Sequence, residues 1–153
     1  MEESMKLVKA QREGLEKIVA ISKRAFESDV EVGGAFGDCP PEYDSFTWHE
    51  QMLKEGHLFQ AIEDDEVIGG AILFLSENKE SLYVGRIFVD CIYHKKGYGI
   101  ALMQLVETYY SSIKKIKLDT PLWNVRTNAF YKKIGYREVK RDEQFAYYQK
   151  DFE

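Results

Sequence analysis

The chain has 153 residues, of which 44% are hydrophobic and 31% charged, a balance typical of one soluble globular domain with a proper core. No apolar run reaches the roughly 20 residues of a membrane span, and the first ten residues lack the apolar stretch of a secretory signal. The net charge of −5 argues against nucleic acid as a partner, because backbone binding needs clustered Lys and Arg. We therefore expect a cytoplasmic protein that binds neither membrane nor nucleic acid.

The cysteines and histidines are few and scattered. Cys39 and Cys91 are too few for a disulfide framework. No pair of His or Cys residues stands at metal-ligand spacing, so no metal site is expected. Cys91 has no neighbouring His and Asp that would make it a nucleophile, and it is interpreted as structural.

The first third of the chain predicts a strand, two helices and a loop between them. Residues 6–10 form the candidate strand, and apolar residues recur at helical spacing over 11–26. A second helix is predicted to begin with Asp44 or Ser45 as N-cap and to end at Gly56. The intervening residues 28–43 hold three glycines and two prolines. Such a segment in a compact domain is commonly a binding loop.

The rest of the chain predicts an antiparallel meander followed by alternating helices and strands. The meander strands are expected at 58–62, 67–75 and 82–89, with polar turns between them. A helix begins near Gly97 and carries one apolar face through Leu102, Leu105, Val106, Tyr109 and Ile113. A strand at 115–120, a helix at 125–134 closed by Gly135, and strands at 136–141 and 144–151 complete the order. This pattern predicts a single α+β domain over 1–153, with one mixed, mostly antiparallel sheet of six to seven strands and about four helices.

The most informative segment runs from the strand residues Ile87–Val89 through a turn to two glycines that open a helix. The start of a helix leaves about four N–H groups unpaired and carries partial positive charge, so it receives phosphates. Gly97 and Gly99 allow close approach to the backbone, and Lys95 and Lys96 add charge. The dinucleotide pattern G-x-G-x-x-G is broken at Leu102, and no P-loop pattern is present. On these residues alone, a phosphate site and a simple tight turn remain alternatives.

The same segment resembles motif A of the GNAT superfamily of N-acetyltransferases, V-x-x-x-x-[QR]-x-x-G-x-[GA]. Val89, Gly97 and Gly99 match it, whereas His94 replaces the usual Gln or Arg and Lys95 stands where many members have a further glycine. The resemblance implies that backbone N–H groups of this turn bind the pyrophosphate of CoA beside the end of the strand. The implied cofactor-binding residues are Ile87, Phe88, Val89, His94, Lys95, Lys96, Gly97, Tyr98, Gly99 and Ile100.

A second segment resembles the family's motif B, N-x-x-A-x-x-x-Y-x-K-x-G-[FY]. Asn124, Tyr131, Lys133, Gly135 and Tyr136 match it, and Thr127 takes the position of the Ala. From periodicity alone Tyr131 is a core aromatic and Asn124 a helix N-cap. The resemblance implies further roles: Asn124 binds the pantetheine or the backbone around it, and Tyr131 protonates the departing thiolate.

The resemblance implies a GNAT-like fold and direct transfer of an acetyl group from acetyl-CoA to a primary amine within a ternary complex. A backbone N–H near Val89 would polarise the thioester carbonyl. Glu31 and Asp38 are candidates for acceptor recognition, and the acidic loop favours a small cationic amine. Many relatives pair, so a homodimer is a further expectation. Two alternatives remain open: a GNAT-fold module that binds acyl-CoA without transferring the acyl group, and a phosphate-binding domain unrelated to CoA.

Overall fold

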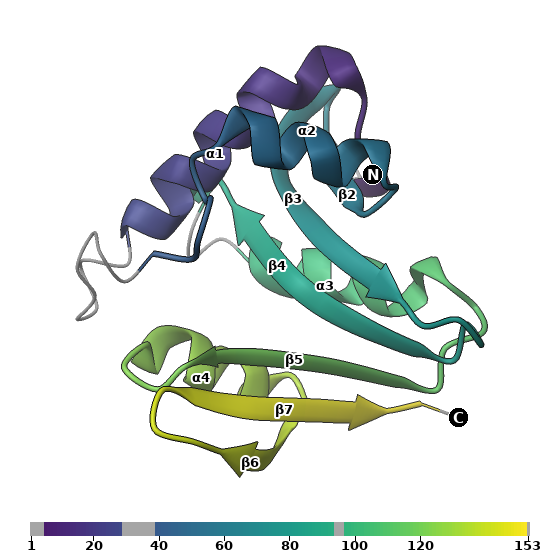
Figure 1. Cartoon of the computed structure of the whole chain (residues 1–153), viewed down its shortest axis with the longest axis vertical. Coiled ribbons are helices and arrows are strands. Elements are labelled where there is room, and N and C mark those ends of the chain that lie inside the picture. Colours follow the sequence, from purple (N-terminus) through teal and green to yellow (C-terminus); the bar gives the residue numbers. More distant parts are fainter. Residues whose placement is uncertain (1–4, 29–38, 94–96, 153) are drawn as a thin grey trace.

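The computed structural model describes residues 5–28, 39–93 and 97–152 (Figure 1). One seven-stranded sheet has the strand order β1-β2-β3-β4-β5-β7-β6. Its strands are β1 (Lys6–Lys9), β2 (Leu58–Glu63), β3 (Glu66–Leu75), β4 (Ser81–Val89), β5 (Lys115–Pro121), β6 (Arg137–Arg141) and β7 (Phe145–Asp151). The α-helices in these ranges are α1 (Leu15–Glu27), α2 (Phe46–Lys54), α3 (Tyr98–Tyr109) and α4 (Val125–Lys133). Short 3-10 turns precede α1 (Arg12–Gly14) and follow β4 (Cys91–Tyr93).

The helices cover both faces of the sheet, and each face has its own apolar core. On one face α1 and α2 pack on β2–β4 around Leu15, Ile18, Ile72 and Phe88. On the other face α3 and α4 pack around a larger cluster that includes Leu102 and Val106 of α3. The predicted α+β fold with a mixed sheet of six to seven strands and four helices is confirmed.

Capping residues and glycines end most helices where the sequence predicted. Ser45 caps α2, its Oγ accepting from the Trp48 N–H at 3.0 Å, and Asn124 caps α4, its Oδ1 accepting from the Thr127 N–H at 3.1 Å. Gly56 and Gly135 follow their helices with φ of 84° and 103°, the left-handed conformation that favours glycine. The predicted helical position of Ile113 is wrong. α3 ends at Tyr109, because the following serines form a turn in which the Ser112 Oγ donates to the Lys79 carbonyl at 2.6 Å.

The two central strands of the sheet pair over only part of their length. β4 and β5 are parallel, and their register covers Ser81–Tyr83 against Lys115–Lys117. Beyond these residues β4 continues beside β3, and β5 beside β7. Figure 1 shows the two strands diverging from their shared end toward α4. Among the described residues, the edge of β4 that faces β5 therefore has no partner strand at residues 84–88, although its backbone groups can still bind a ligand.

A bulge lies in β4 at the point where the strands separate. Ile72 of β3 pairs with Arg86 and Leu73 pairs with Val84, so Gly85 is an extra residue in β4. A Cβ at Gly85 would stand 2.8 Å from Phe74 Cε2, and glycine is needed for this close approach. Such a bulge changes the direction of the side chains that follow it, and it places Arg86 on the face that carries α1 and α2.

An ion pair fixes the end of β4 to α1. Arg24 of α1 donates to both carboxylate oxygens of Asp90, at 3.2 and 2.7 Å. The Asp90 side chain is 7% exposed, compared with 47% for Arg24. Burial alone would raise the pKa of Asp90, but hydrogen bonding and the charge of Arg24 outweigh it and lower that pKa below its usual value. The carboxylate form is therefore favoured in the folded protein.

We expect Asp90→Asn to lower the free energy of unfolding at pH 7 by about 1–3 kcal/mol, because it removes charge-assisted hydrogen bonds at a buried position. Because the folded-state pKa lies below the unfolded value of about 3.9, the ionised carboxylate stabilises the fold fully above that pH, and this stabilisation is lost as the pH falls further through the folded-state pKa. Urea unfolding over a pH series should therefore show a variant defect at pH 7 that shrinks as the pH falls below about 4. Asp151→Asn is the control, since its ion pair with Arg137 is more than half exposed on both sides and should change stability by less than about 1 kcal/mol.

Candidate active site

Two cavities lie where β4 and β5 separate, and they meet at shared side chains. The larger cavity has a volume of about 710 Å³ and the smaller one about 440 Å³. Both are lined by Phe26 of α1, Ile87 of β4, and Thr127 and Tyr131 of α4. A molecule in one cavity can therefore contact a molecule in the other at these four residues.

The smaller cavity gathers most of the cofactor residues expected from the sequence. It runs from the end of β4 to the start of α3, and its walls include Ile87, Phe88, Val89, Gly97, Gly99, Ile100 and Tyr131. Tyr98 lines neither cavity, and its ring packs edge-on against Tyr93 at 5.2 Å between centroids. His94, Lys95 and Lys96 lie outside the described residues, so their expected role stays a prediction.

The start of α3 has the geometry of a phosphate cradle. Gly97 is its N-cap with φ of 83°, and it makes no side-chain cap hydrogen bond. A Cβ at Gly97 would meet no atom of residues 5–28, 39–93 and 97–152 within 4 Å, so no described side chain fills the space beside this backbone. The first N–H groups of a helix have no partner within the helix and favour an anion. These residues fit the pyrophosphate of CoA.

Tyr131 lies at the junction of the two cavities. Its side chain is 6% exposed and packs against Tyr136 and Tyr148, with ring centroids 6.0 Å apart in each pair. Burial, and secondarily the charge of Asp119, raise the pKa of Tyr131 above its usual value. Its hydroxyl is therefore protonated throughout the physiological pH range. Tyr131 is thus a core aromatic, as periodicity alone indicated, and it also borders the site.

Asn124 combines a structural role with a place at the site. It is 2% exposed and caps α4 through Oδ1, as the sequence predicted. It also lines the larger cavity. Its expected contact with pantetheine stays a prediction. Glu31 and Asp38, the candidates for acceptor recognition, lie outside the described residues.

The larger cavity contains charged residues that sequence reasoning missed. Asp119 of β5, Arg86 of β4 and Glu143 between β6 and β7 all line it. The Asp119 carboxylate accepts a hydrogen bond from the Tyr83 hydroxyl at 2.7 Å. The only sequence signal was a charged residue within each strand, Arg86 in the mostly apolar β4 and Asp119 in β5, where polar and apolar residues alternate, and this pattern also describes a solvent-facing residue.

The sequence profile of the acetyltransferase (GNAT) family matches residues 15–136, which include the three cavity-lining helices α1, α3 and α4. The chain belongs to the GNAT acetyltransferase family. This assignment excludes the alternative of a phosphate-binding domain unrelated to that family. No curated protein sequence matches this GNAT chain significantly.

Solved structures with the same fold extend over nearly the whole chain. The PaiA N-acetyltransferase of Thermoplasma acidophilum in complex with coenzyme A is 18% identical, with a TM-score of 0.81 over 97% of this chain and 99% of that one. A GNAT-family acetyltransferase of Streptococcus agalactiae is 18% identical, with a TM-score of 0.83 over 97% and 96%. The ribosomal-protein-S18-alanine N-acetyltransferase of Escherichia coli is 16% identical, with a TM-score of 0.73 over 96% and 93%. At these identities the likeness shows the GNAT fold.

Metal sites and membrane-spanning helices are both absent from residues 5–28, 39–93 and 97–152. No group of three or more His, Cys, Asp and Glu side chains there is placed to hold a metal ion. None of the helices in the same ranges is long and apolar enough to cross a membrane.

Proposed function

We propose that this GNAT protein transfers an acetyl group from acetyl-CoA to a small primary amine, directly, within a ternary complex. The observation that carries the proposal is the meeting of two cavities at Tyr131, one beside a phosphate cradle and the other beside Asp119. Two reactants can then lie side by side at one point. Such positioning can contribute roughly 7–11 kcal/mol to lowering a reaction barrier.

The smaller cavity suits the donor. Gly97 and Gly99 at the start of α3 would bind the pyrophosphate, and the edge of β4 at residues 84–88, where β5 no longer pairs with it, would pair with the amides of the pantetheine arm. This path leads along Ile87–Val89 to Tyr131. A backbone N–H near Val89 would then stabilise the oxyanion that forms when the thioester carbonyl is attacked.

The larger cavity suits the acceptor. Its volume of about 710 Å³ lies within the range of about 300–1,000 Å³ typical of small-molecule sites. An amine is protonated at pH 7 and must lose a proton before it attacks, and the Asp119 carboxylate in this cavity can accept it directly or through water. These features support a small amine as acceptor.

The proposed reaction forms a C–N bond and breaks the C–S bond. The ammonium group gives one proton to Asp119 before the attack, and Asp119 later releases it to solvent. The nitrogen of the tetrahedral intermediate loses a second proton as the C–S bond breaks, while Tyr131 donates a hydrogen bond to the sulfur on which negative charge develops. A thiol has a lower pKa, about 8.5, than a tyrosine, so full proton transfer from Tyr131 is uphill unless a proton is returned to it. The second proton lost by the nitrogen can supply that return, and CoA then leaves as the free thiol.

The cofactor half of the proposal can be tested by calorimetric titration with acetyl-CoA. We expect one-to-one binding that Gly97→Ala weakens about tenfold or more, because the new Cβ occupies the space of the phosphate and backbone hydrogen bonds to a charged group are lost. Gly56→Ala is the matched control, since Gly56 has nearly the same positive φ but follows α2, away from both cavities. The Gly56→Ala variant has a similar backbone strain, but its new Cβ does not block the candidate phosphate site.

The transfer half can be tested by following free-thiol release with a panel of primary amines. Release that depends on an amine would support the transferase. Binding of acetyl-CoA without transfer to any amine would instead favour the alternative, a GNAT-fold module that binds acyl-CoA as a sensor or regulatory partner. A folded protein that does not bind acetyl-CoA would contradict both.

A further inference from the structure

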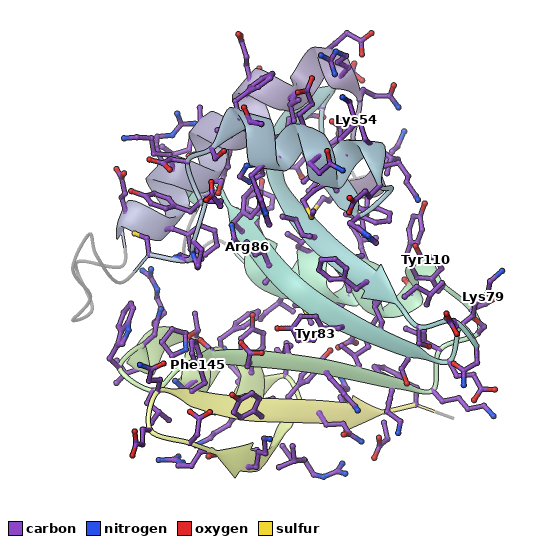
Figure 2. All side chains as sticks on the ribbon, viewed as in Figure 1. Lys54, Lys79, Tyr83, Arg86, Tyr110 and Phe145 are labelled. Atoms are coloured by element: carbon purple, nitrogen blue, oxygen red, sulfur yellow. The ribbon has the colours of Figure 1, made fainter. Side chains whose placement is uncertain are left out.

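The larger cavity has opposite charges on two strands that face the same side of the sheet. Arg86 lies on β4, whereas Asp119 lies on β5 and Glu143 just before β7. Figure 2 shows Arg86 toward α2, Phe145 at the start of β7, and Tyr83 between the two strands. The cavity thus has a cationic end beneath α2 and an anionic end beside β5 and β7.

The Arg86 guanidinium at the cationic end has few partners. Its Cζ lies 4.3 Å from the centroid of the Trp48 ring, and its Nη2 donates to the Pro41 carbonyl. Nη1 is buried, and no atom of the described residues is its hydrogen-bond partner. Within the described ranges no carboxylate lies within ion-pair distance, 4.0 Å, of Arg86. A charged donor in such a position favours an anionic acceptor.

The neighbours of Arg86 do not neutralise its charge. Burial lowers the pKa of Arg86 to about 10, partly offset by Glu42, so the guanidinium is charged at pH 7. His49 lies close enough for that charge to act on it, but burial is the main cause that lowers the pKa of His49. The imidazole is therefore neutral at pH 7. It contacts the Ser45 carbonyl through Nδ1 at 2.6 Å and offers no negative charge.

Tyr83 lies between the two ends of the cavity. Its hydroxyl donates to Asp119 at 2.7 Å. Burial and the bond to Asp119 raise the pKa of Tyr83, while the nearby charge of Arg86 acts in the opposite direction. Tyr83 does not itself line the cavity, but it lies near both Asp119 and Arg86, which do.

We propose that the acceptor is a primary amine that also carries a carboxylate, with the amine at Asp119 and the carboxylate at Arg86. This inference rests on the proposed transferase function and names the class of its acceptor. A guanidinium binds a carboxylate through two parallel N–H···O bonds, which are stronger than its single bond to a neutral carbonyl. The carboxylate would replace the Pro41 carbonyl, which belongs to an exposed residue that lines the cavity. A diamine would instead bring a second positive charge toward Arg86.

Matched acceptor pairs that differ only in the carboxylate test this proposal. Phenylalanine with phenethylamine and ornithine with putrescine are two such pairs, and glycine, β-alanine and 4-aminobutyrate vary the spacing between the two groups. The measured quantity is the ratio of kcat/KM for the carboxylated and decarboxylated members of a pair. We expect this ratio to favour the carboxylated member of at least one pair and to fall about ten- to hundredfold in Arg86→Gln.

Two further variants separate a role in specificity from a role in folding. Arg86→Lys keeps the positive charge and should retain part of the preference. Arg137→Gln removes an arginine from an exposed ion pair with Asp151, away from both cavities, and should leave the ratio unchanged. Thermal unfolding identifies any variant that does not fold. If Arg86→Gln does not fold, the ratio of kcat/KM values measured for the wild type decides by itself whether the acceptor carries a carboxylate.

The outcomes distinguish this inference from the proposed function. If the wild type acetylates amines but never prefers the carboxylated member, or if Arg86→Gln keeps the preference, the carboxylate site is wrong while the transferase stands. If no acceptor is acetylated, the transferase proposal fails, and titrations followed by the fluorescence of Trp48 and Trp123, with the same compounds in the presence of CoA, test whether the cavity binds a carboxylated amine. Binding of carboxylated compounds alone, lost in Arg86→Gln, supports the site; absence of such binding overturns it.

Discussion

Tyr131→Phe is expected to lower kcat for acetyl transfer about 100-fold or more, while the dissociation constant of acetyl-CoA changes little. A positioned acid contributes about 10²–10⁴-fold to a rate, and Tyr131 lies where the two cavities meet. The phenylalanine ring keeps the packing against Tyr136 and Tyr148, so binding of the donor should remain. Steady-state kinetics with the best amine, together with calorimetry, measures the two effects separately.

Tyr148→Phe is the matched control for this experiment. Tyr148 belongs to the same aromatic cluster and is 1% exposed, but it lines neither cavity. Its hydroxyl donates to Asn128 Oδ1 at 2.6 Å, so the variant should lose stability by about 1–3 kcal/mol and keep most of its kcat. Wild-type turnover in Tyr131→Phe would remove the hydroxyl from the mechanism. An equal loss of kcat in both variants would point to packing instead of chemistry.

The elements of this fold could be predicted because local residues determine their ends. Ser45 and Asn124 cap helices through contacts three residues away in the chain, and Gly56 and Gly135 adopt the left-handed conformation that ends them. The phosphate cradle also depends on a short segment, so Gly97 could be found from the sequence. Tyr131 required the resemblance to a family motif, because periodicity alone gave a core aromatic.

The charged residues of the larger cavity could not be predicted, because their positions depend on strand pairing. Asp119 borders an opening only because β4 and β5 stop pairing after Tyr83 and Lys117. Arg86 faces the same side because Gly85 forms a bulge opposite β3. Neither the end of the pairing nor the bulge can be recognised from the residues of one strand alone. A charged residue in a strand is normally interpreted as facing solvent. The sequence therefore predicts acceptor recognition in the acidic loop and not at these two strands.

Asp119→Asn is expected to lower kcat at pH 7 by about 100-fold, the typical contribution of a general base. Asparagine keeps a hydrogen bond with the Tyr83 hydroxyl in place of the carboxylate that accepts it at 2.7 Å, so the fold should tolerate the change. The defect should shrink as the assay pH rises toward the pKa of the amine, because more of the acceptor is then already deprotonated. It should also be smaller for acceptors whose amines have a lower pKa.

Glu143→Gln separates a base at one position from the general negative charge of the cavity. Glu143 lines the same cavity and loses the same charge, but the pKa of Tyr131 responds to Asp119, which indicates that Asp119 is the carboxylate near the reacting atoms. We expect Glu143→Gln to weaken acceptor binding, seen as a higher KM, with kcat within about threefold of wild type. Equal kcat losses in the two variants, or a defect in Asp119→Asn that does not change with pH, would assign Asp119 to binding the ammonium group and leave deprotonation to solvent.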